Sequence, residues 1–212
     1  SLKHKVSHLP LLNIKKKETN EVDFDQYKGI IFTSANALKN LDTTKIGKNI
    51  VCFCVGLATE KKAKELGFQN IYCAEGNVNN LKELILQNFD PKIGSLLYVS
   101  GEIVSYNLDR NLIEENYAVD RIINYTATPN ENLDEKFLKE IKSSVPEIVY
   151  IYSENSAKTF YTIIKKYNLD NIWMDTNLMC MGEKASAALN DIKWKKIFLF
   201  NSGEEEFLLY KI

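Results

Sequence analysis

The clearest indication of an α/β fold is Lys28-Gly-Ile-Ile-Phe-Thr33-Ser34-Ala-Asn36-Ala-Leu38. In this stretch an apolar run ends in two hydroxyl residues, and a helix is expected to start directly after them. Such a run predicts a buried strand, and Ser34 is a residue type that caps helices. The same order returns in Glu147-Ile-Val-Tyr-Ile-Tyr-Ser153-Glu-Asn155-Ser156-Ala-Lys158. The chain therefore contains one kind of strand-to-helix turn in two copies.

A second strand-to-helix turn is also repeated, and it contains glycine. Asn49-Ile-Val-Cys-Phe-Cys-Val55-Gly56-Leu-Ala-Thr59-Glu60 is echoed by Leu178-Met-Cys-Met-Gly182-Glu-Lys184-Ala-Ser186. The later copies keep the order of the earlier ones and nearly their spacing. We therefore expect two related α/β halves, each presenting backbone amides and hydroxyl groups where strands run into helices.

Apolar runs alternate with amphipathic segments along the chain, which predicts parallel sheets covered on both faces. The expected strands are residues 6–14 (interrupted by Pro10), 27–33, 49–55, 70–74, 95–99, 118–125, 148–152, 177–181 and 196–200, with a last element at 204–210. The expected helices are residues 35–41, 58–66, 78–88, 108–116, 133–143, 156–167 and 184–189.

Two polar stretches, residues 15–21 and 126–132, interrupt this alternation and are predicted to be linkers. They favour a discontinuous layout, in which residues 1–16 with 128–212 form one α/β domain and residues 17–127 form an inserted one. We expect a two-stranded linker between these domains and a ligand-binding cleft where they meet. The chain begins without Met, like the end of a helix entering a strand, so we expect a strand and most of a helix before it.

The overall composition is that of a soluble globular protein, with 45% hydrophobic and 26% charged residues among 212. A net charge of −1 argues against a nucleic-acid partner. Arg110 and Arg121 are the only arginines, so no arginine cage is expected around an acidic ligand. The chain has neither a run of ~20 apolar residues nor a signal-peptide pattern, which predicts no membrane association and a cytoplasmic location.

The residues that usually bind metals or act as nucleophiles are sparse. His4 and His8 lie near the chain start, so neither a zinc site nor a Ser/His/Asp triad is expected. The cysteines lack metal-ligand spacing and are expected to be small buried hydrophobes in a reducing compartment. They are Cys52, Cys54, Cys73 and Cys180. No metal or cofactor is predicted.

The candidate ligand contacts lie where predicted strands run into helices, because helix N-termini at that edge of a parallel sheet bind anions. They are Thr33, Ser34, Ala35, Asn36, Gly56, Thr59, Ser100, Gly101, Glu102, Ser153, Asn155, Ser156 and Gly182. Glycine at such a turn allows the backbone to approach a ligand closely. The serines are also ordinary N-caps, so a purely structural role is the alternative for each. Glu183 and Lys184 are expected to be solvated charges of a first helical turn.

Tyr125 is a further candidate, because it stands where the middle domain passes into the second linker. A tyrosine hydroxyl donates hydrogen bonds at neutral pH, so Tyr125 is a candidate donor to the ligand if it faces the cleft. The alternative is an aromatic side chain at a strand edge, one of 11 tyrosines in the chain.

Five motifs in this order resemble the uroporphyrinogen-III synthase family of tetrapyrrole biosynthesis, and the resemblance covers essentially the whole chain. They are Phe32-Thr33-Ser34-Ala35-Asn36-Ala37, Val55-Gly56-Leu57-Ala58-Thr59, Tyr98-Val99-Ser100-Gly101-Glu102, Tyr125-Thr126 and Tyr152-Ser153-Glu154-Asn155-Ser156-Ala157. The resemblance implies two α/β domains, a two-stranded connection and an active site in the cleft.

The resemblance also implies the reaction and the partners. Linear hydroxymethylbilane loses its hydroxyl as water, ring D is inverted through a spirocyclic intermediate, and the macrocycle closes to uroporphyrinogen III. The enzyme would be a cofactor-independent, monomeric hydro-lyase of haem biosynthesis that transiently meets the upstream deaminase. Tyr125 matches the family's tyrosine proposed to hydrogen-bond the departing hydroxyl, and Thr59 and Ser153 match positions that line the cleft.

The sequence differs from the family at two places, and two other functions are also considered. Ala185 stands where the family often has a hydroxyl residue, although Ser186 is adjacent, and the family's initial strand and Thr-Arg-Pro loop are absent from this sequence. A non-catalytic, hinged, two-lobed protein that binds a small anion is the rival from another class. A phosphosugar or nucleotide enzyme is less favoured, because the chain has no G-x-G-x-x-G or Walker motif.

Overall fold

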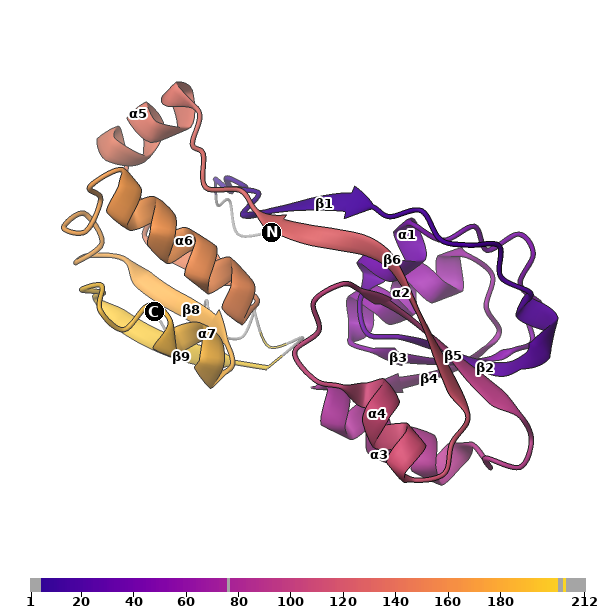
Figure 1. The fold of residues 1–212 in the computed structure, drawn as a ribbon. Helices are drawn as coiled ribbons and strands as arrows, with labels where there is room; N and C mark the ends of the chain where they lie inside the picture. Colours follow the sequence, from indigo (N-terminus) through magenta and orange to yellow (C-terminus); the bar gives the residue numbers. More distant parts are fainter. Residues whose placement is uncertain (1–4, 76, 202–203, 205–212) are drawn as a thin grey trace. The chain divides into compact units, whose positions relative to one another are not determined.

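The computed structural model describes residues 5–75, 77–201 and 204 (Figure 1). The chain divides into two compact units. Unit 1 consists of Ser1–Asn13 and Thr128–Ile212, and unit 2 consists of Ile14–Ala127. Both units are α/β, and both contain parallel sheets.

Unit 2 contains most of a six-stranded sheet with the order β1-β6-β5-β2-β3-β4. Its elements, with the two strands that cross the unit boundary, are β1 (Leu12–Lys16), the short 3-10 helix η1 (Phe24–Gln26), β2 (Tyr27–Phe32), α1 (Ala35–Lys39), β3 (Val51–Val55), α2 (Leu57–Glu65), β4 (Asn70–Ala74), α3 (Val78–Asn88), β5 (Ser95–Gly101), α4 (Leu108–Glu114) and β6 (Val119–Pro129).

The direction of winding changes at β2. From β2 the chain builds β3 and then β4 outward on one side, and it then returns to place β5 and β6 on the other side. The pairs β2–β3, β3–β4, β2–β5 and β5–β6 are all parallel. In such sheets the crevice at the carboxyl ends of the two strands flanking the switch is the usual ligand site. Here those strands are β2 and β5.

Helices cover both faces of this sheet, as the uninterrupted apolar strands require. Ile30 and Phe32 of β2 pack on one face with α1 and α2. Ile31, which points the opposite way, packs on the other face with α3 and α4. Figure 1 shows these two helix pairs on opposite sides of the unit 2 sheet.

Unit 1 contains a three-stranded parallel sheet with the order β7-β8-β9. Helices α5, α6 and α7 contribute to the core on one face, around Trp173. The opposite face buries Met179 and Phe200. The elements are α5 (Glu135–Ser143), β7 (Ile148–Ile151), α6 (Glu154–Lys166), β8 (Asn177–Met181), α7 (Glu183–Ala187) and β9 (Lys196–Phe200). The element predicted at residues 204–210 and His4 lie outside the described residues, apart from residue 204.

The predicted linkers are partly strands in the structure. β1 extends through Lys16 and β6 through Pro129, and the two strands are neighbours in the sheet, so these segments form the expected two-stranded linker. The reason is backbone pairing, since the Lys17 N–H donates to the Asn124 carbonyl and the Asn130 N–H donates to the Leu11 carbonyl, both at 2.9 Å. β1 also begins later than predicted, after Pro10, because proline cannot donate to a ladder.

The two repeated glycine turns have the same backbone conformation. Gly56 has φ 78° and ψ 149°, and Gly182 has φ 84° and ψ 164°. Only glycine adopts this region without strain. A Cβ added at either position would meet no atom within 4 Å, so conformation rather than crowding accounts for both glycines. The turns match at the level of the backbone as well as the sequence.

We expect Gly56→Ala and Gly182→Ala each to lower the free energy of unfolding by about 1–3 kcal/mol, because alanine is strained at this φ. Gly47→Ala is the control, since its Cβ also meets nothing and its φ is not in the left-handed region. Urea unfolding followed by far-UV circular dichroism measures all three. Fluorescence adds a local reporter for Gly182→Ala, because both tryptophans lie in the unit 1 core. Equal stability of the three variants would contradict the assignment.

Candidate functional site

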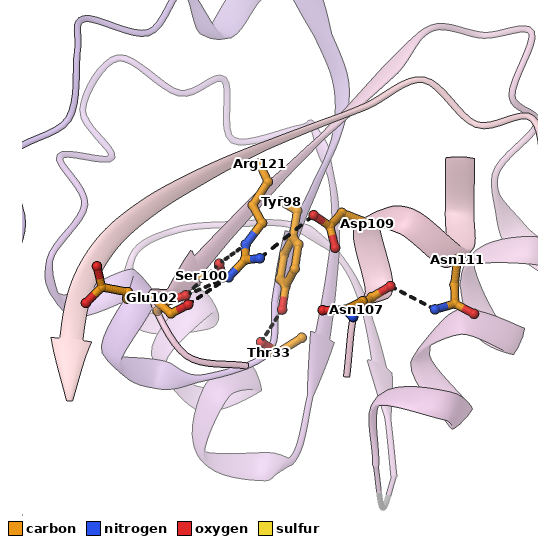
Figure 2. A network of polar contacts seen from close by, with 9 residues as sticks. Thr33, Tyr98, Ser100, Glu102, Asn107, Asp109, Asn111 and Arg121 are labelled. Carbon is orange, nitrogen blue, oxygen red and sulfur yellow. Dashed lines mark hydrogen bonds and ion pairs between the residues drawn. The ribbon is translucent and has the colours of Figure 1, made fainter. Parts of the chain in front are cut away.

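The candidate site in unit 2 lies at the carboxyl ends of β2 and β5, the strands that flank the switch. Thr33 follows β2, and its hydroxyl lies 3.1 Å from the hydroxyl of Tyr98 on β5 (Figure 2). Burial raises the pKa of Tyr98, so its hydroxyl keeps its proton at neutral pH. This hydrogen bond joins the two strand ends and places polar side chains where the topology favours a ligand.

Ser100 and Glu102, both predicted ligand contacts, already have partners within the protein, Ser100 in a buried position and Glu102 on the surface. Ser100 is 1% exposed, and its Oγ accepts from Arg121 at 2.8 Å and donates to the Gly101 carbonyl at 3.1 Å. The Glu102 carboxylate pairs with Lys17 at 2.9 Å, and its N–H donates to the Tyr125 carbonyl at 3.0 Å. These bonds shape the end of β5, and they occupy the polar groups that were predicted to contact a ligand directly.

Tyr125 lies against Gly101. A Cβ built on Gly101 would stand 2.7 Å from Cζ and 2.9 Å from the hydroxyl oxygen of Tyr125, so the phenol end of the ring covers this glycine. A register shift between Ser100 and Gly101 brings Gly101 opposite Tyr125. Tyr125 is half-buried, and its hydroxyl end lies beside the end of β5. The structure thus places the predicted catalytic residue beside the predicted Ser100–Glu102 segment.

The serine turns are helix caps in both copies. The Ser34 side chain accepts from the Asn36 N–H at 3.2 Å, and the Ser153 side chain accepts from the Ser156 N–H at 3.1 Å. Ser153 also donates to the Ser156 hydroxyl at 2.9 Å. These bonds occupy amides that the sequence analysis offered to a ligand. The neighbouring candidates differ in exposure: Ala35 and Asn36 are half-buried and Asn155 is exposed.

The glycine turns have the opposite hydrogen-bonding state. No described side chain caps α2 after Gly56 or α7 after Gly182. First-turn amides have no partner within their own helix, and the helix dipole favours an anion beside them. The amides best able to bind a carboxylate therefore follow the glycines. Thr59 and its counterpart Ala185 are 4% and 1% exposed, so this pair occupies a packing position in both units.

Arg121, Tyr98 and Lys17 belong to the site but were not predicted as site residues. Each contacts it through residues distant in the chain: Arg121 through Ser100, Tyr98 through Thr33, and Lys17 through Glu102. One feature of the sequence could have pointed to Arg121: it is one of only two arginines in a lysine-rich chain, and it lies inside a strand. Figure 2 shows its guanidinium group between Ser100 and Asp109.

The thiols are poor candidates for catalysis. Burial raises the pKa of Cys52 to about 12 and that of Cys180 to about 11, and it also raises the pKa values of Cys54 and Cys73. All four thiols therefore stay protonated at neutral pH.

Within residues 5–75, 77–201 and 204, no group of three or more His, Cys, Asp or Glu side chains is arranged to hold a metal ion. No helix in this part of the chain has the length and apolar character of a membrane span.

The chain is an α/β protein of two units, each with a parallel sheet. The chain matches the family model described as uroporphyrinogen-III synthase HemD over residues 1–199. It therefore belongs to the uroporphyrinogen-III synthase family, the cyclising lyases of haem biosynthesis.

A solved structure of the family supports the fold. The chain is similar to the uroporphyrinogen-III synthetase of Helicobacter pylori 26695, with 21% identity, a TM-score of 0.64, and coverage of 96% of this chain and 92% of that one. A mutant uroporphyrinogen III synthase of the extremely thermophilic bacterium Thermus thermophilus is 13% identical over 95% of this chain and 86% of that one, with a TM-score of 0.47. No curated protein sequence matches the chain.

We expect Gly101→Ala to lower the free energy of unfolding by about 1–3 kcal/mol, because its methyl group would overlap the Tyr125 ring. The same change in a Tyr125→Ala background should cost much less, since the overlapping atoms are gone. Urea unfolding of the two single variants and the double variant measures this coupling. An equal penalty in both backgrounds would show that the two residues are not in contact.

Proposed function

We propose that this chain performs the reaction of its family, the cyclisation of hydroxymethylbilane with inversion of ring D and loss of water, at the strand ends described above. The observation that carries the proposal is the repeated glycine turn. In both units an uncapped helix start follows a strand that is paired on both sides, β3 in unit 2 and β8 in unit 1. The family matches are to synthases, which favours this function over a non-catalytic anion-binding protein.

The substrate carries eight carboxylates, and the uncapped amides after Gly56 and Gly182 suit such groups. Charge-assisted hydrogen bonds from backbone N–H groups are stronger than neutral ones, so binding does not require an arginine cage. The space over both glycines is open, which allows a carboxylate to approach the backbone. We assign a substrate carboxylate to the start of α2, with the serine turn before α1 as a rigid support.

The catalytic contribution is mainly positioning. Hydroxide leaves an electron-rich pyrrole readily, and the unaided bilane closes without inversion, so the protein must hold ring D with its substituted carbon ready to attack. Tyr125 donates a hydrogen bond to the departing hydroxyl as its bond to carbon breaks. The hydroxyl end of the Tyr125 ring lies over Gly101, the last residue of β5, so the donor stands at the end of one of the two strands that flank the switch.

Residues 1–16 with 128–212 and residues 17–127 act as two domains. The enzyme works in the cytoplasm as a monomer, without metal or cofactor. It takes hydroxymethylbilane from the upstream deaminase through a transient encounter.

Incubating the purified chain with hydroxymethylbilane, and separating isomers III and I by chromatography, tests the function. We expect isomer III from the wild type, and at least a ~10-fold lower rate from Tyr125→Phe with an unchanged fold. Tyr161→Phe is the matched control. Tyr161 lies on α6, and its hydroxyl makes a solvent-exposed contact with Asp191 at 3.5 Å. Isomer I alone from the wild type removes the synthase function. Unchanged turnover in Tyr125→Phe removes only the role of that residue.

Ser153 allows its capping role to be separated from a role beside the substrate. Ser153→Ala should lower the free energy of unfolding by about 1 kcal/mol, because α6 loses its cap. Ser153→Asp should retain the cap, since aspartate is an equally good capping residue. Its added charge should nevertheless raise KM several-fold by repelling a substrate carboxylate. A KM equal to that of the wild type in Ser153→Asp would leave Ser153 as a cap only.

A further inference from the structure

We propose that Arg121 is a positioning residue for this reaction: it holds the end of β5 in the shape that places Tyr125 and Thr33 for the substrate. The inference rests on the proposed function. Arg121 lies on β6, four residues before Tyr125, and its side chain reaches back across the end of β5.

The guanidinium group of Arg121 binds three consecutive residues at the end of β5. Its Nε donates to the Ser100 hydroxyl at 2.8 Å, and Nη2 donates to the carbonyls of Gly101 and Glu102 at 2.9 Å and 3.3 Å. These acceptors lie where the register between β5 and β6 shifts. A bulge weakens the ladder locally, so side-chain donors at this point fix a strand end that the ladder alone would leave loose.

The arrangement is specific to arginine. Nη1 faces Asp109 at 3.9 Å, and the Arg121 and Asp109 side chains are only 20% and 18% exposed. The guanidinium carbon also lies 5.7 Å from the centre of the Tyr98 ring. A planar fork with several fixed donors can meet these partners together, whereas a lysine ammonium acts as a single point charge.

Arg121 thereby links the groups proposed to meet the substrate. Through Gly101 it fixes the surface on which the Tyr125 ring rests. Beside Tyr98 it supports the side chain that hydrogen-bonds Thr33 at the end of β2 (Figure 2). Its donors are directed to protein acceptors, and its charge faces Asp109. Its effect on the reaction is therefore indirect, through the geometry of the strand end.

The test is a single-turnover experiment with enzyme in excess over hydroxymethylbilane. The rate of isomer III formation, measured over a range of enzyme concentrations, separates binding from the chemical step. We expect Arg121→Met to slow the chemical step at least ~10-fold with a binding constant within about two-fold of the wild type. Arg121→Lys should restore only part of the rate, because it restores the charge without the fork.

Arg110→Met is the matched control, since Arg110 is the other arginine and lies exposed on α4. It should match the wild type in both constants. If Arg121→Met does not fold, Ser100→Ala replaces it. That change leaves Arg121 in place but removes the acceptor of Nε and the Ser100 hydrogen bond to the Gly101 carbonyl, and it should also slow the chemical step. A wild-type chemical rate in folded Arg121→Met, or in Ser100→Ala where it replaces that variant, overturns the inference.

The outcome of the wild-type arm keeps the two proposals apart. If the wild type yields only isomer I, the proposed function fails. If the wild type yields isomer III and the folded Arg121 variants do so at the same rate, the function stands and this inference alone is wrong.

Discussion

The parallel pairing of β2 with β3 on one side and β5 on the other is the constraint on which unit 2 depends. Ile30 lies opposite Cys52 in one pair and Leu97 in the other, so β2 is hydrogen-bonded along both edges. Parallel strands all end at the same edge of a sheet. The residues that follow β2, β3 and β5 must therefore gather there, and the change in winding direction at β2 makes that edge the natural ligand site.

Hydrogen bonding gives the two repeated turns different functions. Ser34 and Ser153 close the amides of their own helices, which stabilises α1 and α6 and withdraws those amides from a ligand. Gly56 and Gly182 leave their helix starts uncapped, in a backbone conformation that other residues adopt only with strain. In both units the helix start without a side-chain cap follows glycine, and the capped one follows serine. The repeat therefore preserves the difference between capped and uncapped helix starts.

The framework was predictable because it depends on local signals. The apolar run at residues 27–33 predicted β2, and the hydroxyl of Ser34 predicted the start of α1. Glycine after an apolar run predicted the turns at Gly56 and Gly182. The two-stranded linker was predicted, but the ends of its strands were not, because they depend on backbone partners distant in the chain, such as the Asn124 carbonyl that accepts from the Lys17 N–H just after β1. The environment of Tyr125 was not predictable, since nothing near Gly101 in sequence indicates that an aromatic ring covers it.

The alternation of strands and helices, the internal repeat and the family could be read from the amino-acid sequence, because apolar periodicity, caps and glycine turns are properties of neighbouring residues. Which polar groups remain available to a ligand became clear only from the three-dimensional fold. Thr59 is buried, Ser100 is hydrogen-bonded to Arg121, and the phenol of Tyr125 lies against Gly101. The physical reason is that hydrogen bonds and close contacts join residues distant in the chain, so availability to a ligand is settled only when strands pair and helices cover them.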